Sequence, residues 1–295
     1  MKTALSALSV ERPKHLDEAL GVLAASVVRE RTIPIAGGTD LFVYLNAGTQ
    51  KGARYLDLGR LRELRGIEVT RTAVVIGALT TFHELRMHRD IRRRLPSLAI
   101  AASEIGAIQI QHRATIAGNI ANASPAGDSL PVLLAHDAVV TVRSIRGSRE
   151  IPFAKLYTGY RQLAIEPDEL IVSVLIPTPP GGAFAFFRKI GTRRAQSISK
   201  VAFCGVIAPH AHGRDPHVRL AYGSVAPVTV RATHAEAVLR GGRPSVALAA
   251  AARAALANDI APIDDIRSDR EYRLEVAGNV LDQFLRAADA RFSRR

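Results

Sequence analysis

Two short glycine-containing turns constrain this chain more than any other feature. The first, at residues 35–41, reads I-A-G-G-T-D-L and follows a strand-like run at residues 32–35. The second, at residues 115–119, reads T-I-A-G-N; the segment S-P-A-G-D at residues 124–128 follows it, and an apolar helix is expected from Asp128. Glycine lets the backbone approach a ligand closely, and successive backbone N–H groups favour phosphate. The pair of turns predicts one anionic ligand shared by two loops.

For either loop taken alone, an ordinary strand-to-helix turn remains the alternative. In the first loop, Thr39 or Asp40 would then cap the next helix. The chain has no G-x-G-x-x-G and no G-x-x-x-x-G-K motif, which argues against a Rossmann fold and a P-loop. If these turns bind phosphate, they do so in a site that is neither a Rossmann turn nor a P-loop.

The net charge of +13 raises nucleic-acid binding as a competing function. One basic cluster comprises Arg86, Arg89, Arg92, Arg93 and Arg94. No stacking aromatic residues interleave with it, the chain has no tryptophan, and no zinc-finger spacing occurs. We therefore expect no nucleic-acid partner, and interpret the cluster as a solvated helix face or a contact with acidic partner subunits.

The single cysteine, Cys204, excludes an internal disulfide. It also excludes an iron–sulfur cluster held by this chain alone, because such clusters need about four cysteine ligands. Cys204 lies in an apolar, strand-like run at residues 201–207, which indicates a buried structural thiol. No stretch approaches the roughly 20 apolar residues of a membrane span, and no secretory signal is evident, so a cytoplasmic protein is expected.

The apolar pattern predicts alternating short elements and then a change of character. Strands are expected at residues 54–58, 73–76, 138–142 and 169–176, and helices at residues 18–25, from about residue 41, and at residues 91–103, where Pro96 complicates the start. Thr81 and Glu84 form a capping-box pattern. A breaker-rich linker at residues 177–182 precedes three strands (184–189, 201–207 and 218–225), with Gly213, Asp215 and Pro216 in a turn. Three helices follow: one beginning with a second capping box at Thr233 and Glu236, one at residues 246–257, and one at about residues 270–288.

Several motifs in order give the chain a specific resemblance to a known family. They include A-G-G-T-D-L at residues 36–41, T-I-A-G-N, S-P-A-G-D, G-Y-R at residues 159–161, P-D-E-L-I at residues 167–171, and the pattern K-x-x-x-R-R formed by Lys189, Arg193 and Arg194. With these motifs the chain resembles the FAD-binding medium subunit of molybdenum hydroxylases, the xanthine dehydrogenase and carbon monoxide dehydrogenase group. The match covers nearly the whole chain.

The resemblance implies an α+β fold. It places a two-lobed FAD-binding domain of the PCMH type at residues 1–178. A smaller domain of the dehydrogenase flavoprotein type, with a three-stranded antiparallel sheet and a helical bundle, is expected at residues 183–295.

The resemblance also implies which residues bind the cofactor FAD. In the family the two glycine turns hold the pyrophosphate and ribityl portions, further contacts come from an aspartate and an apolar residue near the flavin, and a lysine supplies positive charge. One departure is Ala117, which replaces the first glycine of the usual T-I-G-G-N; a methyl group is tolerable there if φ stays negative. The expected FAD-binding residues are Ile33, Pro34, Ile35, Ala36, Gly37, Gly38, Thr39, Asp40, Gly106, Thr115, Ile116, Ala117, Gly118, Asn119, Asp128, Ile171 and Lys189.

The implied function is that of an oxidoreductase subunit for electron transfer. The molybdenum cofactor would lie in a large partner subunit and two 2Fe–2S clusters in a small one, with electrons leaving FAD to NAD or another acceptor. The residues show no acid–base or nucleophile constellation and no metal site, which suits a bound flavin that carries the chemistry. The alternatives are a free-standing flavin oxidoreductase of the same superfamily and, from charge alone, a nucleic-acid-binding protein. The sequence names neither the substrate nor the terminal acceptor.

Overall fold

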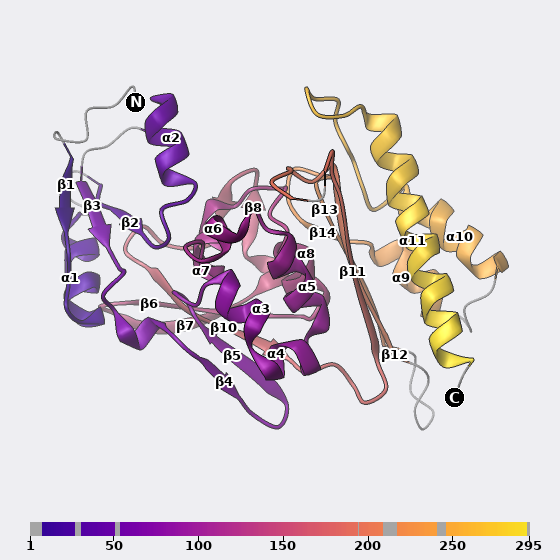
Figure 1. Cartoon of the computed structure of the whole chain (residues 1–295), viewed down its shortest axis with the longest axis horizontal. Helices are drawn as coiled ribbons and strands as arrows, with labels where there is room; N and C mark the ends of the chain where they lie inside the picture. The colour runs from indigo at the N-terminus through magenta and orange to yellow at the C-terminus, as the bar shows by residue number, and fades with distance from the viewer. Residues whose placement is uncertain are drawn as a thin grey trace.

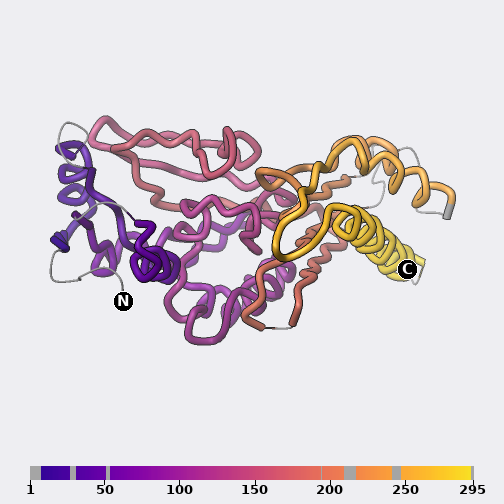
Figure 2. The backbone as a smooth tube through the Cα atoms, turned by 90° about the horizontal axis from the view of Figure 1, so that it is seen from above, coloured from indigo at the N-terminus to yellow at the C-terminus, as the bar shows by residue number. Residues whose placement is uncertain are grey.

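The computed structural model describes residues 8–26, 31–50, 54–193, 195–208, 217–240 and 246–293, with residue 246 described by its backbone alone. The described chain is elongated, with the first elements at one end and the last helices at the other (Figure 1). From above, the chain passes from an N-terminal lobe through a central body to the C-terminal helices (Figure 2). Arg194 and the expected turn at Gly213, Asp215 and Pro216 lie outside the described residues.

The N-terminal lobe is a small parallel sheet with two helices. Strands β1 (Ser9–Glu11) and β2 (Ile33–Ile35) both pair in parallel with β3 (Arg54–Asp57), which gives the order β1-β3-β2. Helix α1 (Leu16–Ser26) buries Leu16, Leu20 and Leu23 in the core. The first glycine turn leads from β2 into α2 (Leu41–Ala47), which ends at Gly48 in the left-handed conformation.

The central body is built on a five-stranded antiparallel sheet of order β4-β5-β10-β6-β7. Strand β10 occupies its middle and brings the segment before the linker next to both β5 and β6. The strands are β4 (Ile67–Val69), β5 (Ala73–Gly77), β6 (Val139–Ser144), β7 (Gly147–Pro152) and β10 (Leu170–Pro177). A small hairpin, β8 (Tyr157–Gly159) and β9 (Gln162–Leu163), precedes β10, and two 3₁₀ turns cover Arg62–Leu64 and Phe153–Lys155.

Six short helices occupy the segment between β5 and β6. Among them, α5 contacts β11, and α8 contacts β12 and β13 of the C-terminal sheet. They are α3 (Phe82–Met87), α4 (Arg89–Arg94), α5 (Pro96–Glu104), α6 (Ile108–Gln111), α7 (Ile116–Asn122) and α8 (Leu130–Ala135).

The C-terminal sheet is a layer shared by two hydrophobic cores. Its strands β11 (Phe184–Ile190), β12 (Val201–Ala208), β13 (His217–Gly223) and β14 (Val230–Arg231) are antiparallel in that order. Along β12, Cys204 and Val206 face the core of the central body, whereas Phe203 and Ile207 face a second core. Helices α9 (Thr233–Arg240), α10 (Val246–Leu256) and α11 (Arg270–Phe292) cover that second core.

The structure confirms the predicted α+β class and the three C-terminal strands, to which the two-residue β14 is added at one edge. None of the described helices is both long enough and apolar enough to cross a bilayer. Cys204 is fully buried, as its apolar run indicated.

Two local predictions show what sequence pattern can and cannot determine. The first capping box is confirmed: the Thr81 hydroxyl accepts a hydrogen bond from the Glu84 N–H at 3.2 Å, and the Glu84 carboxylate accepts one from the Thr81 N–H at 2.7 Å. The single helix expected at residues 91–103 is wrong. It divides into α4 and α5, because Pro96 lacks an N–H and is accommodated at the first turn of a new helix.

The second capping box is also wrong. Glu236 is completely buried, and its carboxylate accepts hydrogen bonds from the Leu220 N–H at 2.8 Å and from Arg231 at 2.6 Å. The first turn of α9 is instead capped by the distant Asp259, whose carboxylate accepts from the N–H groups of His234 (3.0 Å) and Ala235 (3.1 Å). A tertiary contact thus replaces the local cap that the sequence suggested.

Candidate functional site

The two glycine turns lie directly against each other. A side chain at Gly37 would place its Cβ 2.0 Å from the carbonyl oxygen of Arg113, just before the second turn. Arg113 Nε also donates to the Gly37 carbonyl at 3.4 Å, and a Cβ on Gly118 would lie 3.9 Å from the Cβ of Ala36. Gly37 is therefore required by the packing of one loop on the other, in addition to any approach of a ligand.

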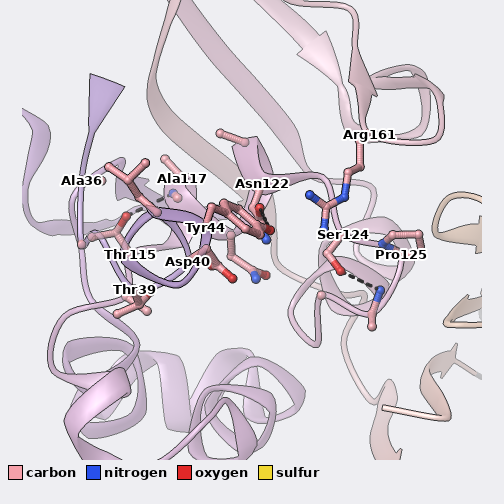
Figure 3. A pocket seen from close by; sticks show the side chains of 18 of the residues that line it. Ala36, Thr39, Asp40, Tyr44, Thr115, Ala117, Asn122, Ser124, Pro125 and Arg161 are labelled. Carbon is pink, nitrogen blue, oxygen red and sulfur yellow. Dashed lines mark hydrogen bonds between the residues drawn. The ribbon is translucent and has the colours of Figure 1, made fainter. Parts of the chain in front are cut away.

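These loops form one side of a pocket of about 1530 Å³. Its other walls come from residues 124–128, from the β8–β9 hairpin, from the start of β10, and from C-terminal segments at residues 196–199, 224–227 and 261–273. Figure 3 shows Ala36, Thr39 and Asp40 of the first loop close to Thr115 and Ala117 of the second. The volume exceeds the roughly 300–1,000 Å³ of most small-molecule pockets, so the pocket can take a large ligand.

All predicted site residues line this pocket except Ile116 and Lys189. Ile116 is completely buried at the start of α7, where it belongs to the core of the central body. Lys189 lies behind Asp128, which does line the pocket. The structure thus gathers the two turns, Gly106, Asp128 and Ile171 around one space and places Lys189 one contact away.

The first loop offers backbone donors to a ligand. The N–H groups of Gly37, Gly38, Thr39 and Asp40 have no hydrogen-bond acceptor among the described residues, and all four residues line the pocket. Asp40 occupies the N-cap position of α2, but its side chain accepts no capping hydrogen bond. Gly38 has a φ of +75°, which glycine adopts without strain. Such a run of donors fits the phosphate groups of a dinucleotide.

The second loop is ordered by its own side chains. The Thr115 hydroxyl accepts a hydrogen bond from the Gly118 N–H at 3.1 Å and so caps α7. Asn119 Oδ1 accepts from the Ser129 hydroxyl at 2.6 Å, which connects this loop to the start of α8. The departure at Ala117 is accommodated, because that residue lies inside α7 and its φ is not among the positive ones.

Asp128 forms a buried polar centre at the pocket wall. Its carboxylate accepts hydrogen bonds from Lys189 Nζ at 2.6 Å and from the Ser199 hydroxyl, and the Lys189 side chain is only 3% exposed. Burial raises the pKa of Asp128, while the charge and hydrogen bond of Lys189 and the hydrogen bond of Ser199 oppose that rise. The ammonium of Lys189 thus offsets part of the cost of burying the Asp128 carboxylate at the pocket wall.

Gly106 shapes another part of the pocket wall through its backbone. Its φ is +54°, and a Cβ there would meet the side chain of Ile110 at 2.8 Å. Its carbonyl oxygen accepts a hydrogen bond from the Gln196 N–H at 3.0 Å, which joins the loop after β11 to the central body. This contact brings the pocket-lining segment at residues 196–199 over the site.

Sequence reasoning missed several pocket residues that lie outside the glycine turns. Tyr44 and Asn122 line the pocket and are joined by a hydrogen bond of 2.9 Å from the Tyr44 hydroxyl to Asn122 Oδ1. Arg161 lines it from the turn of the β8–β9 hairpin. The S-P-A-G-D and G-Y-R motifs were visible signals for Ser124, Pro125 and Arg161 (Figure 3). Among the described residues, no group of three or more His, Cys, Asp or Glu side chains could hold a metal ion.

Comparison with known proteins agrees with this site. Residues 6–179 match the family described as "FAD binding domain in molybdopterin dehydrogenase", and residues 186–288 match "CO dehydrogenase flavoprotein C-terminal domain". The chain is 32% identical over 272 residues to the xanthine dehydrogenase FAD-binding subunit of Escherichia coli O157:H7, covering 91% of each chain. It is 30% identical over 280 residues to the carbon monoxide dehydrogenase medium chain of Hydrogenophaga pseudoflava, covering 95% of this chain and 96% of that one.

A solved structure shares the whole fold. It is a carbon monoxide dehydrogenase from Hydrogenophaga pseudoflava that lacks the Mo-pyranopterin moiety of the molybdenum cofactor, and it superimposes with a TM-score of 0.92 at 28% identity over 99% of both chains. The free N–H groups of the first loop and the large pocket suit a dinucleotide such as FAD. The chain therefore belongs to the FAD-binding medium subunits of the xanthine and carbon monoxide dehydrogenase family, and it is an oxidoreductase flavoprotein.

Proposed function

We propose that this chain is the electron-transfer subunit of a heteromeric molybdenum hydroxylase. In that role it receives electrons from 2Fe–2S clusters of a small subunit, while a large subunit with the molybdenum cofactor oxidises the substrate. NAD or another acceptor takes the electrons away. FAD supplies the required chemistry, since a flavin exchanges electrons either in pairs or singly.

The observation that carries the proposal is the pocket itself. Its described lining combines backbone donors, the buried carboxylate of Asp128, which is paired with Lys189 behind it, and apolar side chains such as Ile171. It contains no Ser–His or Cys–His pair that would suit catalysis by the protein's own side chains. Such a site binds and orients a cofactor, and leaves substrate chemistry to another subunit.

A set of exposed apolar side chains at the pocket supports a partner that docks there. Ile198 and Ile263 line the pocket yet remain 53% and 67% exposed, and Ile266 is 100% exposed. Ile266 directly follows the pocket-lining Asp265 in the chain, and exposed apolar side chains beside a pocket favour a protein interaction site. We define these three isoleucines as the apolar rim and propose that the iron–sulfur subunit covers it. Cluster and flavin must lie close together for electron transfer, so a docking surface at the pocket is needed.

The proposal also includes a division of the chain into an FAD-binding domain at residues 1–178 and a C-terminal domain at residues 183–295. The separate second core under α9–α11 supports it, although the C-terminal sheet contributes to both cores. A cytoplasmic location belongs to the same proposal, and cell fractionation tests it.

Reconstitution tests the function. On its own, the purified chain should bind one FAD, which its flavin absorption spectrum would reveal. Without partner subunits it should hydroxylate neither xanthine nor aldehydes nor carbon monoxide. Adding both partner subunits should restore activity with one of these substrate classes. Hydroxylation by the isolated chain, free of molybdenum and iron, would exclude the proposal.

The rim can be tested by one matched pair of variants. Ile266→Lys should weaken assembly with the iron–sulfur subunit and leave FAD binding unchanged. Ile145→Lys changes another exposed isoleucine, 64% exposed against 100% for Ile266, that lies in the turn between β6 and β7 outside the apolar rim, and it should leave assembly intact. Equal assembly by both variants would place the docking surface elsewhere.

A further inference from the structure

Arg161 has an unusual backbone conformation at the edge of the pocket. It occupies the two-residue turn between β8 and β9 and has a φ of +54°. In turns, a positive φ is normally met by glycine or asparagine, because a larger side chain adds steric strain. Strained residues that persist tend to lie where they serve a binding or catalytic role. The strained conformation therefore suggests a specific role for the Arg161 side chain at the pocket.

Two tyrosine rings hold the guanidinium in place. Arg161 Cζ lies 5.5 Å from the centre of the Tyr44 ring and 5.9 Å from that of Tyr160, within the range of cation–π contacts. Tyr44 is fixed in turn by its hydrogen bond to Asn122 on α7. Figure 3 shows the side chain reaching from the hairpin into the pocket. Arg161 thus connects the hairpin with the helices that follow both glycine turns.

The charge of Arg161 is not neutralised by an ion pair with any described carboxylate. Other cations line the same pocket, but Arg267 and Arg273 are each paired with Asp265, at 3.2 and 2.7 Å. Arg31 also lines the pocket, and no described contact fixes its guanidinium there. Among the cations that line the described part of the pocket, Arg161 is the one that is both held in position and unpaired with a carboxylate.

The first glycine loop needs such a cation if it binds phosphate. The loop that carries the free N–H groups also carries Asp40, whose negative charge would repel a phosphate beside it. Burial by neighbouring atoms raises the pKa of Asp40, and the positive charge of Arg161 opposes that rise. The field of Arg161 therefore extends to this loop.

We propose that Arg161 binds the diphosphate of FAD and offsets the charge of Asp40. The inference rests on the chain's membership of the FAD-binding family and adds a specific residue to it. The planar guanidinium presents a fork of N–H donors that matches two phosphate oxygens, while Tyr44 and Tyr160 keep its plane oriented. The strained turn is retained because it directs this fork into the pocket.

FAD titration of three variants at low and high salt tests the assignment. Arg161→Asn keeps a residue that tolerates positive φ but removes the charge. It should weaken FAD binding about ten- to a hundredfold at low salt, the size expected for a charged hydrogen bond. The difference in FAD affinity between Arg161→Asn and the unchanged protein should be smaller at high salt, because salt screens the attraction between Arg161 and the diphosphate in the unchanged protein. Arg161→Lys keeps the charge but loses the fork of donors, so it should retain only part of the affinity and bind FAD more tightly than Arg161→Asn. Arg92→Gln changes an exposed arginine outside the pocket and should bind FAD as the unchanged protein does.

Melting temperatures of the cofactor-free proteins show whether the variants fold. Arg161→Asn should melt no lower than the unchanged protein, since it relieves strain in the turn. Unchanged FAD affinity would overturn the proposal, and so would a loss of equal size at low and high salt, which would indicate ring stacking instead. If the unchanged protein itself did not bind FAD, the assignment of FAD as its cofactor would be wrong, whatever the role of Arg161.

Discussion

Lys189 Nζ lies 2.6 Å from Asp128 Oδ2 and 2.9 Å from the carbonyl oxygen of Glu104. One buried ammonium thereby ties strand β11 of the C-terminal sheet to the end of α5 and to the turn before α8. Asp128 also faces the cofactor pocket, so the contact that joins the two halves of the chain also orders the site.

Removing one member of this pair should destabilise the whole chain. Lys189→Met leaves the Asp128 carboxylate buried without its cation, which typically costs about 3–5 kcal/mol. Urea unfolding should show that loss in the free energy of unfolding. The double variant Lys189→Met/Asp128→Asn should lose much less than the sum of the two single changes. Additive losses in this double-mutant cycle would mean that the two groups do not interact in solution.

Gly37 and Gly118 should respond differently to alanine. The Cβ of Gly37→Ala would lie 2.0 Å from a backbone oxygen that cannot move aside, so the cofactor-free protein should melt well below the unchanged protein. The Cβ of Gly118→Ala has one close neighbour, the Thr115 hydroxyl at 3.0 Å, whose side chain can adjust, and an ordinary contact with the Ala36 Cβ at 3.9 Å. This variant should fold nearly normally. Calorimetry without FAD checks both, and equal melting temperatures would contradict the packing role of Gly37.

The sequence revealed the site where its signals were local or matched a known motif. The capping box at Thr81 depends on residues within one turn of a helix, and pattern alone located it. The glycine turns were visible as motifs, but their contact through Gly37 and Arg113 depends on how two lobes pack. Motif reasoning therefore located two loops that line the pocket, and it gave only part of the reason for the glycine at position 37.

The errors arose where distant residues decide the outcome. Glu236 fits a capping pattern, yet its buried carboxylate accepts hydrogen bonds from the Leu220 N–H on β13 and from Arg231. Lys189 was expected beside the cofactor, and the structure places it behind Asp128, which lines the pocket. The spacing of these two residues in the sequence does not show which of them reaches the pocket. Tyr44 has no motif of its own, and its place under Arg161 follows from tertiary packing.

Glu236 should be among the most sensitive residues of the C-terminal part. Its carboxylate is completely buried and accepts bonds from Leu220, Arg231 and Arg240. Glu236→Ala removes the charge and leaves these donors unpaired, which should lower the free energy of unfolding by about 3–5 kcal/mol. The control is Glu271→Gln, at an exposed position in the first turn of α11. This change should alter the free energy of unfolding by less than about 0.5 kcal/mol. Urea denaturation compares them, and a small loss for Glu236→Ala would contradict the buried network.

His136 should make the stability of the chain depend on pH. The residue is buried, and its Nε2 lies 2.9 Å from the Ser97 hydroxyl. Burial and the nearby His217 lower the pKa of His136 from 6.5 to about 4, with Asp137 opposing. Between these values the unfolded chain takes up a proton that the folded chain does not. The free energy of unfolding should therefore fall by up to about 3 kcal/mol as pH drops from 6.5 to 4.

Urea unfolding at several pH values isolates this contribution. His136→Gln keeps a hydrogen-bonding partner for Ser97 but removes the titration, so the decline of stability below pH 6.5 should become shallower by about 1.4 kcal/mol per pH unit. His15→Gln, an exposed change on the N-terminal lobe, controls for the loss of a histidine as such. The same acid-induced decline in His136→Gln and in the unchanged protein would show that the imidazole is already protonated, or freely reached by protons, in the folded chain.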